Sequence, residues 1–242
     1  MDSEKVAYLI NSTPKYYYIL ELHLVLLRRY ARDLKWQVFL ATEEPEHPMC
    51  KKLVVHYDVK LLMLEKENSS FLRSRKRALE LLPEQYTMVL PMQEDFLLER
   101  YIDEDWIRIS VGELEQNENL VSVRYMPCPG PSDTNKERNS LFALIKKEYD
   151  TYGFTFQATI WRRSDCQKWY NTIVNKLNSY NTSNSKVLEV DINIAENSDG
   201  QKLFYSLFEG RLIVGYLRAH KYPNAVYMCP WPYRPTAFIK GK

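Results

Sequence analysis

In the stretch Tyr86-Thr-Met-Val-Leu-Pro-Met-Gln-Glu-Asp-Phe-Leu-Leu98, an apolar run leads directly into acidic residues. Residues 88–92 predict a buried strand, and the polar triplet Gln93, Glu94 and Asp95 follows at once. Two adjacent carboxylates inside apolar sequence are costly to bury unless something pairs with them. A metal ion or a cationic ligand at the carboxyl end of the strand would do so, and open α/β sheets keep their ligand sites there. The alternative is that Glu94 and Asp95 begin a solvated loop.

The residues before this stretch alternate between short apolar runs and segments whose apolar residues have helical spacing. We expect strands at 6–10, 36–41, 59–64 and 88–92, and helices at 18–34, 46–57 and 69–82. Ser69 or Ser70 is a plausible N-cap of the last of these helices. Because each connection is long enough for a right-handed crossover, the first hundred residues predict a doubly wound, mainly parallel sheet.

The second half of the chain is less regular. We expect helices at 103–117, 164–180 and 191–208, strands at 120–126, 211–217 and 225–228, and an edge strand at 152–160. The Pro-rich segment 127–138 predicts a mobile loop, and 181–185 predicts a surface loop. The sequence shows no internal repeat and no interdomain linker, so we predict one α/β domain over residues 1–242. Its core is a mixed, mainly parallel sheet flanked by helices.

Composition excludes several classes of protein. A formal net charge of +2 indicates no basic field for nucleic acid, and 242 residues suffice to bury a core without staples. The four cysteines lack CxxC spacing, which predicts neither a zinc site nor a disulfide framework and favours a reducing, cytoplasmic compartment. No apolar run reaches 18 residues and the acidic N-terminus is not a signal peptide, so we expect no transmembrane segment. With 7 glycines the chain has neither of the two standard Gly-rich nucleotide fingerprints.

A basic helix precedes the acidic strand end and carries Arg73, Arg75, Lys76 and Arg77. The helix dipole disfavours cations near a helix start, unless an anion lies between that start and the strand ends. Arginine suits a phosphate because it forms bidentate hydrogen bonds. A charge run more commonly forms a solvated face, and we expect that for most of these residues. We predict that at least one of the three arginines points into the crevice of the sheet.

Residues 75–95, Arg75-Lys-Arg-Ala-Leu-Glu-Leu-Leu-Pro-Glu-Gln-Tyr-Thr-Met-Val-Leu-Pro-Met-Gln-Glu-Asp95, resemble the central pattern of nucleotide-sugar glycosyltransferases with the GT-A fold. That pattern is a helix bearing Arg or Asn, an apolar strand and an acidic motif of the DxD type. Gln-Glu-Asp is similar to variants found in such enzymes of bacteria and large DNA viruses. The resemblance implies a GT-A-like fold with a nucleotide-binding half, residues 1–98, and an acceptor-binding half, residues 99–242.

The resemblance implies a metal role for Asp95, which would ligate Mn²⁺ or Mg²⁺ bridging the diphosphate of the sugar nucleotide. Glu94 would lie near the ribose or the sugar. Gln93 stands where the family has the first Asp of its motif, and an uncharged amide is a weaker ligand. Metal binding is therefore expected to be weak, indirect or absent, with arginines taking the phosphate charge instead. Thr13 lies in the turn 11–14, where this fold receives the nucleotide base, and is a candidate contact; a plain structural turn is the alternative.

A second element, Gln157-Ala-Thr-Ile-Trp161, is similar to a Gln-x-x-Ile-Trp element of the same glycosyltransferases, near which the acceptor or donor sugar packs. An aromatic side chain offers a sugar ring a flat apolar face at a low entropic cost. Trp161 is therefore a site candidate, and the alternative is that it belongs to the core. Gln157 suits a hydrogen bond to substrate better than it suits a core position.

The resemblance also implies a general base at the start of a helix a few dozen residues after that tryptophan. Glu196 matches this place best and Asp191 is second; either would deprotonate an acceptor hydroxyl in an inverting reaction. Both are alternatively helix N-terminal acids, which the dipole favours.

These observations lead to one functional hypothesis. The chain would be a glycosyltransferase of glycan biosynthesis that moves a hexosyl or related group from a nucleotide diphosphate sugar to a glycan, a lipid-linked molecule or another hydroxyl acceptor. The loop 127–138 would close over the donor. A nucleotidyltransferase is an alternative, although it would normally show a Gly-rich phosphate loop near its start. The other alternative, which Gln93 makes credible, is a non-catalytic module of the same fold that binds nucleotide sugars or glycans.

Overall fold

The computed structural model describes residues 5–67, 69–126, 129–132, 142–179, 193–216 and 229–235. The elements in these ranges are β1 (Val6–Asn11), the 3-10 helix η1 (Pro14–Tyr16), α1 (Tyr17–Tyr30), β2 (Gln37–Thr42), α2 (Pro48–Tyr57), β3 (Lys60–Met63), α3 (Phe71–Leu81), β4 (Met88–Met92), β5 (Phe96–Leu98), α4 (Glu104–Gln116), β6 (Leu120–Arg124), β7 (Phe142–Leu144), β8 (Thr159–Arg162), α5 (Arg163–Ser179), α7 (Ser198–Leu207), β9 (Leu212–Tyr216) and β10 (Tyr233–Pro235).

The main sheet has the strand order β3-β2-β1-β4-β8-β6-β9-β7. Strands β3, β2, β1 and β4 are parallel, as are β6 and β9. Strand β8 runs antiparallel between β4 and β6, and β7 runs antiparallel to β9. A separate ribbon pairs β5 with β10. The predicted fold class, a mixed and mainly parallel sheet flanked by helices, is confirmed.

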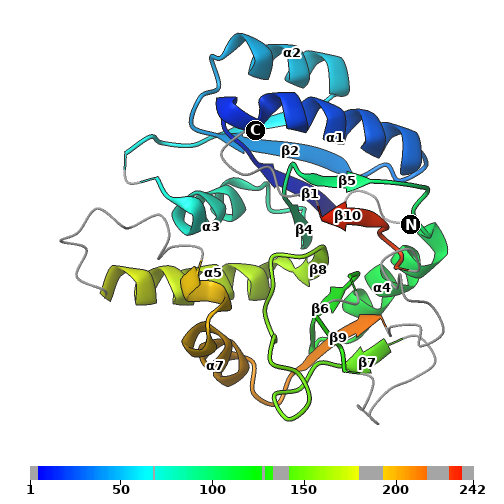
Figure 1. Ribbon diagram of the computed structural model, residues 1–242, viewed down its shortest axis with the longest axis vertical. Coiled ribbons are helices and arrows are strands. Elements are labelled where there is room, and N and C mark those ends of the chain that lie inside the picture. The colour runs from blue at the N-terminus through cyan, green and yellow to red at the C-terminus, as the bar shows by residue number, and fades with distance from the viewer. Residues whose placement is uncertain are drawn as a thin grey trace.

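Helices cover both faces of this sheet (Figure 1). Alternate residues of β1 point to opposite sides, so Tyr8 and Ile10 pack with α1, α2 and α4, whereas Ala7 and Leu9 pack with α3, α5 and α7. This alternation follows from the two-residue period of a strand. Two apolar layers therefore form the core, one on each side of the sheet.

The order of the strands reverses between β1 and β4. From β1 the chain proceeds outward through β2 to β3, with α1 and α2 on one face, and then returns through α3 on the other face to β4. The helix that follows β1 and the helix that precedes β4 thus lie on opposite faces of the sheet. Such a switch point opens a crevice at the carboxyl ends of its two strands, and open α/β sheets bind ligands there.

One prediction about the strands is wrong, and three short strands were not predicted. The segment 152–160 is not an edge strand, because β8 covers Thr159–Arg162 and lies inside the sheet, between β4 and β6. Thr159, Ile160 and Trp161 are all buried, which fits a strand inside the sheet. The short strands β5, β7 and β10 were not predicted, since three residues each are too few for a visible period.

Two predicted helices have different limits in the structure. Helix α1 ends at Tyr30 rather than at residue 34, because Ala31 leaves the helical conformation. The predicted helix 191–208 is interrupted at Asn197, whose side chain accepts a hydrogen bond from the Gly200 amide and caps α7.

Several predicted segments lie outside the described residues: the loop 181–185, the strand 225–228, residues 191 and 192, and most of the loop 127–138. Within the described part of the chain, none of the helices combines the length and the apolar character that crossing a bilayer requires.

Candidate functional site

The carboxyl ends of β1 and β4 bring two polar turns together. These strands pair in parallel with Ile10 opposite Met92, so the residues that follow each of them are neighbours. The Ser12 hydroxyl donates a hydrogen bond to Glu94 Oε1 at 3.3 Å, across 82 residues of sequence. The acidic turn predicted from the sequence therefore lies at the switch point of the sheet.

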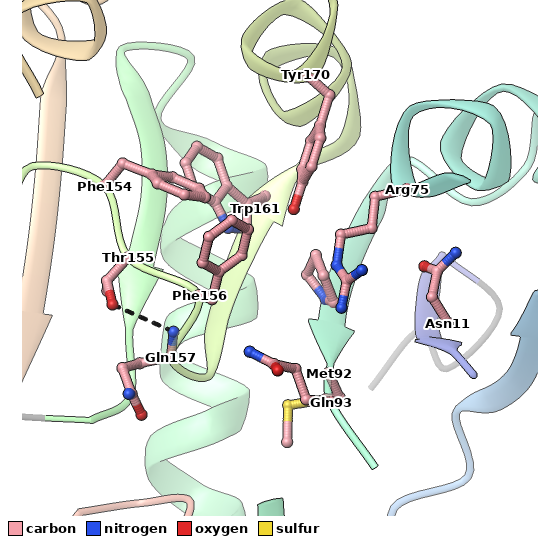
Figure 2. A pocket seen from close by; sticks show the side chains of 11 residues that line it. Asn11, Arg75, Met92, Gln93, Phe154, Thr155, Phe156, Gln157, Trp161 and Tyr170 are labelled. Atoms are coloured by element: carbon pink, nitrogen blue, oxygen red, sulfur yellow. Dashed lines mark hydrogen bonds between the residues drawn. The ribbon is translucent and has the colours of Figure 1, made fainter. Parts of the chain in front are cut away.

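A hollow opens beside this meeting point, on the α3 side of the sheet (Figure 2). It encloses about 370 Å³ of space, part of it open solvent. Its walls come from β1, α3, β4, β8, α5 and the segment before β8. The lining residues are Asn11, Arg75, Pro91, Met92, Gln93, Phe154, Thr155, Phe156, Gln157, Trp161 and Tyr170. The combination of aromatic walls with a few polar groups is typical of small-molecule sites.

Arg75 is the member of the basic helix that lines the hollow. Arg75 is 9% exposed, and its guanidinium carbon lies 3.4 Å from the centre of the Phe71 ring. Arg75 Nη1 also donates a hydrogen bond to the backbone carbonyl of Phe71. Arg73 instead donates to Asn178 at 2.7 Å, and Arg77 pairs with Glu80 at 3.2 Å, both near solvent.

Helical geometry explains why Arg75 differs from its neighbours. The buried residues of α3 are Leu72, Arg75, Ala78 and Leu79, which follow the spacing of a single helix face. Ser70 sets the start of this helix, because its hydroxyl accepts a hydrogen bond from the Arg73 amide. The spacing from Leu72 and Leu79 was the signal in the sequence that could have singled out Arg75.

The two carboxylates of the acidic turn lie in a poorly solvated place. Burial raises the pKa of Glu94 to about 7, against the opposing effects of its backbone hydrogen bond and of the Arg75 charge. Burial also raises the pKa of Asp95, again against Arg75. Asp95 Oδ1 is buried and has no hydrogen-bond partner. An unsatisfied buried carboxylate oxygen is costly, so this atom would gain from a cation or a donor.

The donor set suits a divalent cation that substrate oxygens help to hold. The described part of the chain contains no group of three or more His, Cys, Asp and Glu side chains that would enclose a metal by themselves. Mg²⁺ in enzymes that act on phosphates is, however, commonly held by only one or two carboxylates together with substrate phosphates. Asp95, with its unpartnered Oδ1, and the adjacent Glu94 fit that arrangement.

The wall opposite β1 is the segment 154–157, and the side chains of Gln201 and Glu196 hold its backbone. Gln201 exchanges two hydrogen bonds of 2.9 Å with the amide and the carbonyl of Phe154. Glu196 Oε1 accepts a hydrogen bond of 3.0 Å from the Phe156 amide. Glu196 thus lies beside the hollow without being one of its lining residues, and one of its oxygens is engaged in shaping the wall.

Trp161 combines the two roles that the sequence left open. It is 4% exposed and its ring contacts Phe154 and Phe204, as a core residue does. It also lines the hollow, as does Gln157, which lies at the rim. In Figure 2 the Gln157 side chain points away from Arg75 and Asn11.

Two other predicted site residues are not part of this arrangement. Thr13 is exposed and its side chain makes no cap hydrogen bond, although its carbonyl accepts the Tyr16 amide at the start of η1. It lies just beyond Ser12 and does not line the hollow. Asp191 lies outside the described residues.

Sequence reasoning missed Asn11, Tyr170 and Phe154 as lining residues. Asn11 stood in the predicted turn after the first strand, and its Nδ2 is buried without a partner, a feature that no sequence pattern shows. Tyr170 lies on α5, where its spacing from Cys166 and Ile173 indicated only the buried face of a helix. The polar residue at a strand end was the one signal that could have identified Asn11.

Comparisons with known proteins find distant likenesses only. No family model and no curated protein matches the chain. Among solved structures, 4-diphosphocytidyl-2C-methyl-D-erythritol synthase from Anaerococcus prevotii aligns at 12% identity over 81% of this chain and 84% of that one, with a TM-score of 0.46. The glycosyltransferase GlyE from Streptococcus pneumoniae aligns at 10% identity over 85% of this chain and 43% of that one, with a TM-score of 0.47.

TarS from S. aureus aligns at 9% identity over 93% of this chain and 64% of that one, with a TM-score of 0.45. The chain therefore spans less than two thirds of the GlyE and TarS chains with which it aligns. At identities of 12% or less and TM-scores below 0.5, these likenesses assign neither a family nor an activity to this chain.

Proposed function

We propose that this protein is a GT-A-like glycosyltransferase that binds a nucleotide diphosphate sugar at the switch point of its sheet and transfers the sugar to a hydroxyl acceptor. The observation that carries the proposal is the convergence of a buried arginine and a partly buried pair of carboxylates. Arg75 lines the hollow, and its charge acts on Glu94 and Asp95 at the adjacent end of β4. A diphosphate is the kind of group that an arginine and carboxylate-bound metal hold together.

Several residues in and around the crevice would take part in donor binding. Arg75 would take a phosphate oxygen, and its stacking on Phe71 keeps its planar edge in one orientation. Thr13, exposed beyond the end of β1, would contact the base, and Glu94 the ribose or sugar. Arg73 and Arg77, which pair with neighbouring side chains near solvent, would contribute only to the surrounding positive field.

Asp95 would hold a divalent cation through Oδ1, with Glu94 nearby and Gln93 as a neutral neighbour. A bound Mn²⁺ or Mg²⁺ would neutralise the charge that develops on the departing nucleoside diphosphate. Because stabilisation of the leaving group is a large part of the barrier in such reactions, Arg75 and Asp95 would act on the same charge from two sides.

Glu196 would be the general base for the acceptor hydroxyl in an inverting reaction, with Asp191 as the second choice. The Phe156 amide occupies Glu196 Oε1, so Oε2 is the atom that would accept the proton. Trp161 would offer its face to a sugar ring, and Gln157 a hydrogen bond at the rim. Residues 99–242 would in this way supply the acceptor half of the site, with a glycan or a lipid-linked molecule as the acceptor.

Thermal unfolding with UDP-, GDP-, TDP- and CMP-sugars, each with and without Mn²⁺, tests the proposal. At least one nucleotide sugar should raise Tm. Arg75→Ala should weaken its binding by about tenfold or more, the cost of losing a charged hydrogen bond. Arg77→Ala is the matched control on the same helix and should leave binding within about twofold. If no nucleotide sugar stabilises the protein, the proposed function is wrong. If both variants bind like the parent, the placement of the diphosphate is wrong.

A non-catalytic module that binds the same ligands is the second candidate, and one contact favours it. The proposed base Glu196 already engages one oxygen in holding the Phe156 amide, which is a structural role. Release of nucleoside diphosphate from a bound nucleotide sugar, with water or added sugars as acceptor, separates the two candidates. Release that Glu196→Gln abolishes while binding persists supports the enzyme. Binding without any release supports the module.

A further inference from the structure

Gln157, at the rim of the hollow, is held by a residue far away in sequence. Its side-chain Oε1 accepts a hydrogen bond from the hydroxyl of Tyr233, 76 residues later in β10. The same hydroxyl accepts a hydrogen bond of 3.2 Å from the Ala158 amide, at the start of the β8 region. One tyrosine therefore contacts both a lining side chain and the backbone beside it.

The hydrogen bond from the Tyr233 hydroxyl holds the Gln157 amide in one orientation. A hydroxyl has one proton, and the Ala158 N–H already occupies one of its lone pairs as a donor. The Tyr233 hydroxyl donates its proton to Gln157 Oε1 while it accepts from the Ala158 amide. Burial raises the pKa of Tyr233 well above its ordinary value, so the hydroxyl keeps this proton. The Gln157 Nε2 and its two donors are left for another partner.

Tyr233 also contacts the strand that follows the acidic turn. Its ring stacks on Phe96, with 4.5 Å between ring centres, and Phe96 follows Asp95 directly. Strand β10 pairs with β5 so that Tyr233 lies opposite Leu98. Tyr233 is fully buried and is thus a rigid link between the turn that carries Asp95 and the wall that carries Gln157.

The direction of the Gln157 side chain indicates which part of a ligand it would meet. It points away from Arg75 and Asn11, toward the carboxyl edge of the sheet, where β8 begins (Figure 2). The Gln157 side chain is therefore not directed at a phosphate beside Arg75. A sugar that extends from the diphosphate past Asp95 would instead come to this rim.

We propose that Tyr233 is a positioning residue that orients the Gln157 amide, so that Gln157 Nε2 donates to an oxygen of the transferred sugar and not to the nucleotide. This inference rests on the proposed function, because it assigns one contact within that donor site. It adds a residue of the C-terminal ribbon to a site otherwise built from β1, α3, β4, β8 and α5.

The first arm of the test needs no ligand. In ¹⁵N–¹H spectra of the free protein, the side-chain amide of Gln157 is assigned by its loss in Gln157→Leu. Tyr233→Phe, which keeps the stack on Phe96, should shift this amide pair strongly. Tyr216→Phe is the matched control, since its hydroxyl bonds to Trp106 and Ser110 far from the hollow, and it should leave the pair unmoved. An unshifted Gln157 amide in Tyr233→Phe overturns the proposal, whatever the protein binds.

The second arm compares UDP-glucose with UDP, and GDP-mannose with GDP, by calorimetry. Gln157→Leu and Tyr233→Phe should each weaken nucleotide-sugar binding by about tenfold and leave nucleoside diphosphate binding within about twofold. In the Gln157→Leu background, Tyr233→Phe should add no further loss, because it acts through Gln157. Equal losses for sugar and nucleotide, or additive losses, overturn the proposal.

Gln157→Glu keeps the acceptor for Tyr233 while removing both donors, so it covers the case in which Tyr233→Phe fails to fold. The Gln157→Glu variant should retain the Tm of the free protein and lose the preference for the nucleotide sugar over the nucleotide. A retained preference would overturn the assignment of Gln157 Nε2 as the hydrogen-bond donor to the sugar. If UDP, GDP and their sugars all fail to bind the parent protein, the proposed function is wrong, and so is the proposed contact between Gln157 and the sugar. The spectra of the free protein still decide whether Tyr233 orients Gln157.

Discussion

Burial separates Arg75 from the other arginines of α3, and this single difference determines which residue can meet a ligand in the hollow. Arg73, Arg75 and Arg77 are chemically identical and lie within five residues of sequence. Only the position of Arg75 falls on the buried stripe of the helix, where Phe71 stacks on its guanidinium at 3.4 Å. A charge in that place loses hydration and gains strength as a partner for an anion.

Removal of the Asp95 charge should abolish the effect of metal on nucleotide binding. We expect Mn²⁺ to tighten UDP binding at least about tenfold in the parent protein and to have no effect in Asp95→Asn. The physical reason is that Oδ1 of Asp95 is buried without a hydrogen-bond partner, and a bound cation would give this oxygen the partner it lacks. Titration calorimetry with and without EDTA measures this.

Asp33→Asn is the control for the metal experiment, because Asp33 is exposed and pairs with Arg32. It should retain the full effect of Mn²⁺. Equal loss in both variants would mean that the metal acts through the general charge of the protein, and an unchanged effect in Asp95→Asn would exclude Asp95 as its ligand.

His23 should make the fold sensitive to mild acid. Burial lowers the pKa of His23 from 6.5 to about 4, and its Nε2 lies 2.6 Å from the Tyr8 hydroxyl. The unfolded chain takes up the proton first, so the stability that neutral His23 provides is complete above about pH 6.5 and is lost as the pH falls toward 4. This loss is on the order of 3 kcal/mol.

Urea unfolding of the parent and of His23→Gln between pH 7.5 and 4.5 measures this dependence. The free-energy difference between the two proteins should fall as the pH falls, since glutamine takes up no proton. His56→Gln, at an exposed position, is the control and should follow the parent at every pH. Parallel curves for the parent and His23→Gln would contradict the buried, neutral state of this histidine.

Among the elements, α3 has side chains at both ends that satisfy its backbone. Ser70 caps its start, and Arg163, the first residue of α5, donates to four carbonyls at and beyond its last turn: those of Leu79, Leu82, Pro83 and Tyr86. A cation is also favoured at a helix carboxyl end by the dipole. Arg163 thereby fixes α3, and with it Arg75, against the strand that carries Trp161.

Arg163→Lys should destabilise the protein by roughly 2 kcal/mol, because one ammonium cannot reach the carbonyls that the planar guanidinium reaches together. Arg108→Lys, in an exposed pair with Glu104, should change stability by less than about 0.5 kcal/mol. Urea unfolding of the three proteins measures both effects. Equal stability of the two variants would show that the carbonyls accept other partners.

For the molecule as a whole, β8 joins the two halves of the sheet. It pairs with β4 from the first half and with β6 from the second, and α5, which follows it, packs on α3. We therefore expect one cooperative unfolding transition. Tryptophan fluorescence, which reports on Trp36 and Trp231 on one face and on Trp169 on the other, should change together with far-UV circular dichroism in urea. Two separate transitions would show that the halves fold independently.

Local pattern was sufficient for the four parallel strands of the first half of the fold and for the helices between them. The runs 6–10 and 88–92 became β1 and β4 almost to the residue, since apolar runs between helical segments leave few other solutions. The place of Glu94 and Asp95 at a strand end also followed from sequence, because charge stops a buried strand. The position of β8 did not follow, because the residues of a four-residue strand do not show which strands are its neighbours.

The sequence by itself determined the alternation of elements, the cap of α3 and the acidic turn at the end of β4, all of which depend on residues a few positions apart. Tertiary structure alone decided that Arg75 faces the hollow, that Ser12 meets Glu94 and that Tyr233 holds Gln157. Ser12 and Glu94 are 82 positions apart in the sequence, and Gln157 and Tyr233 are 76 positions apart. Helical and strand periods describe neighbours along the chain, whereas such contacts exist only after the sheet has brought distant strands side by side.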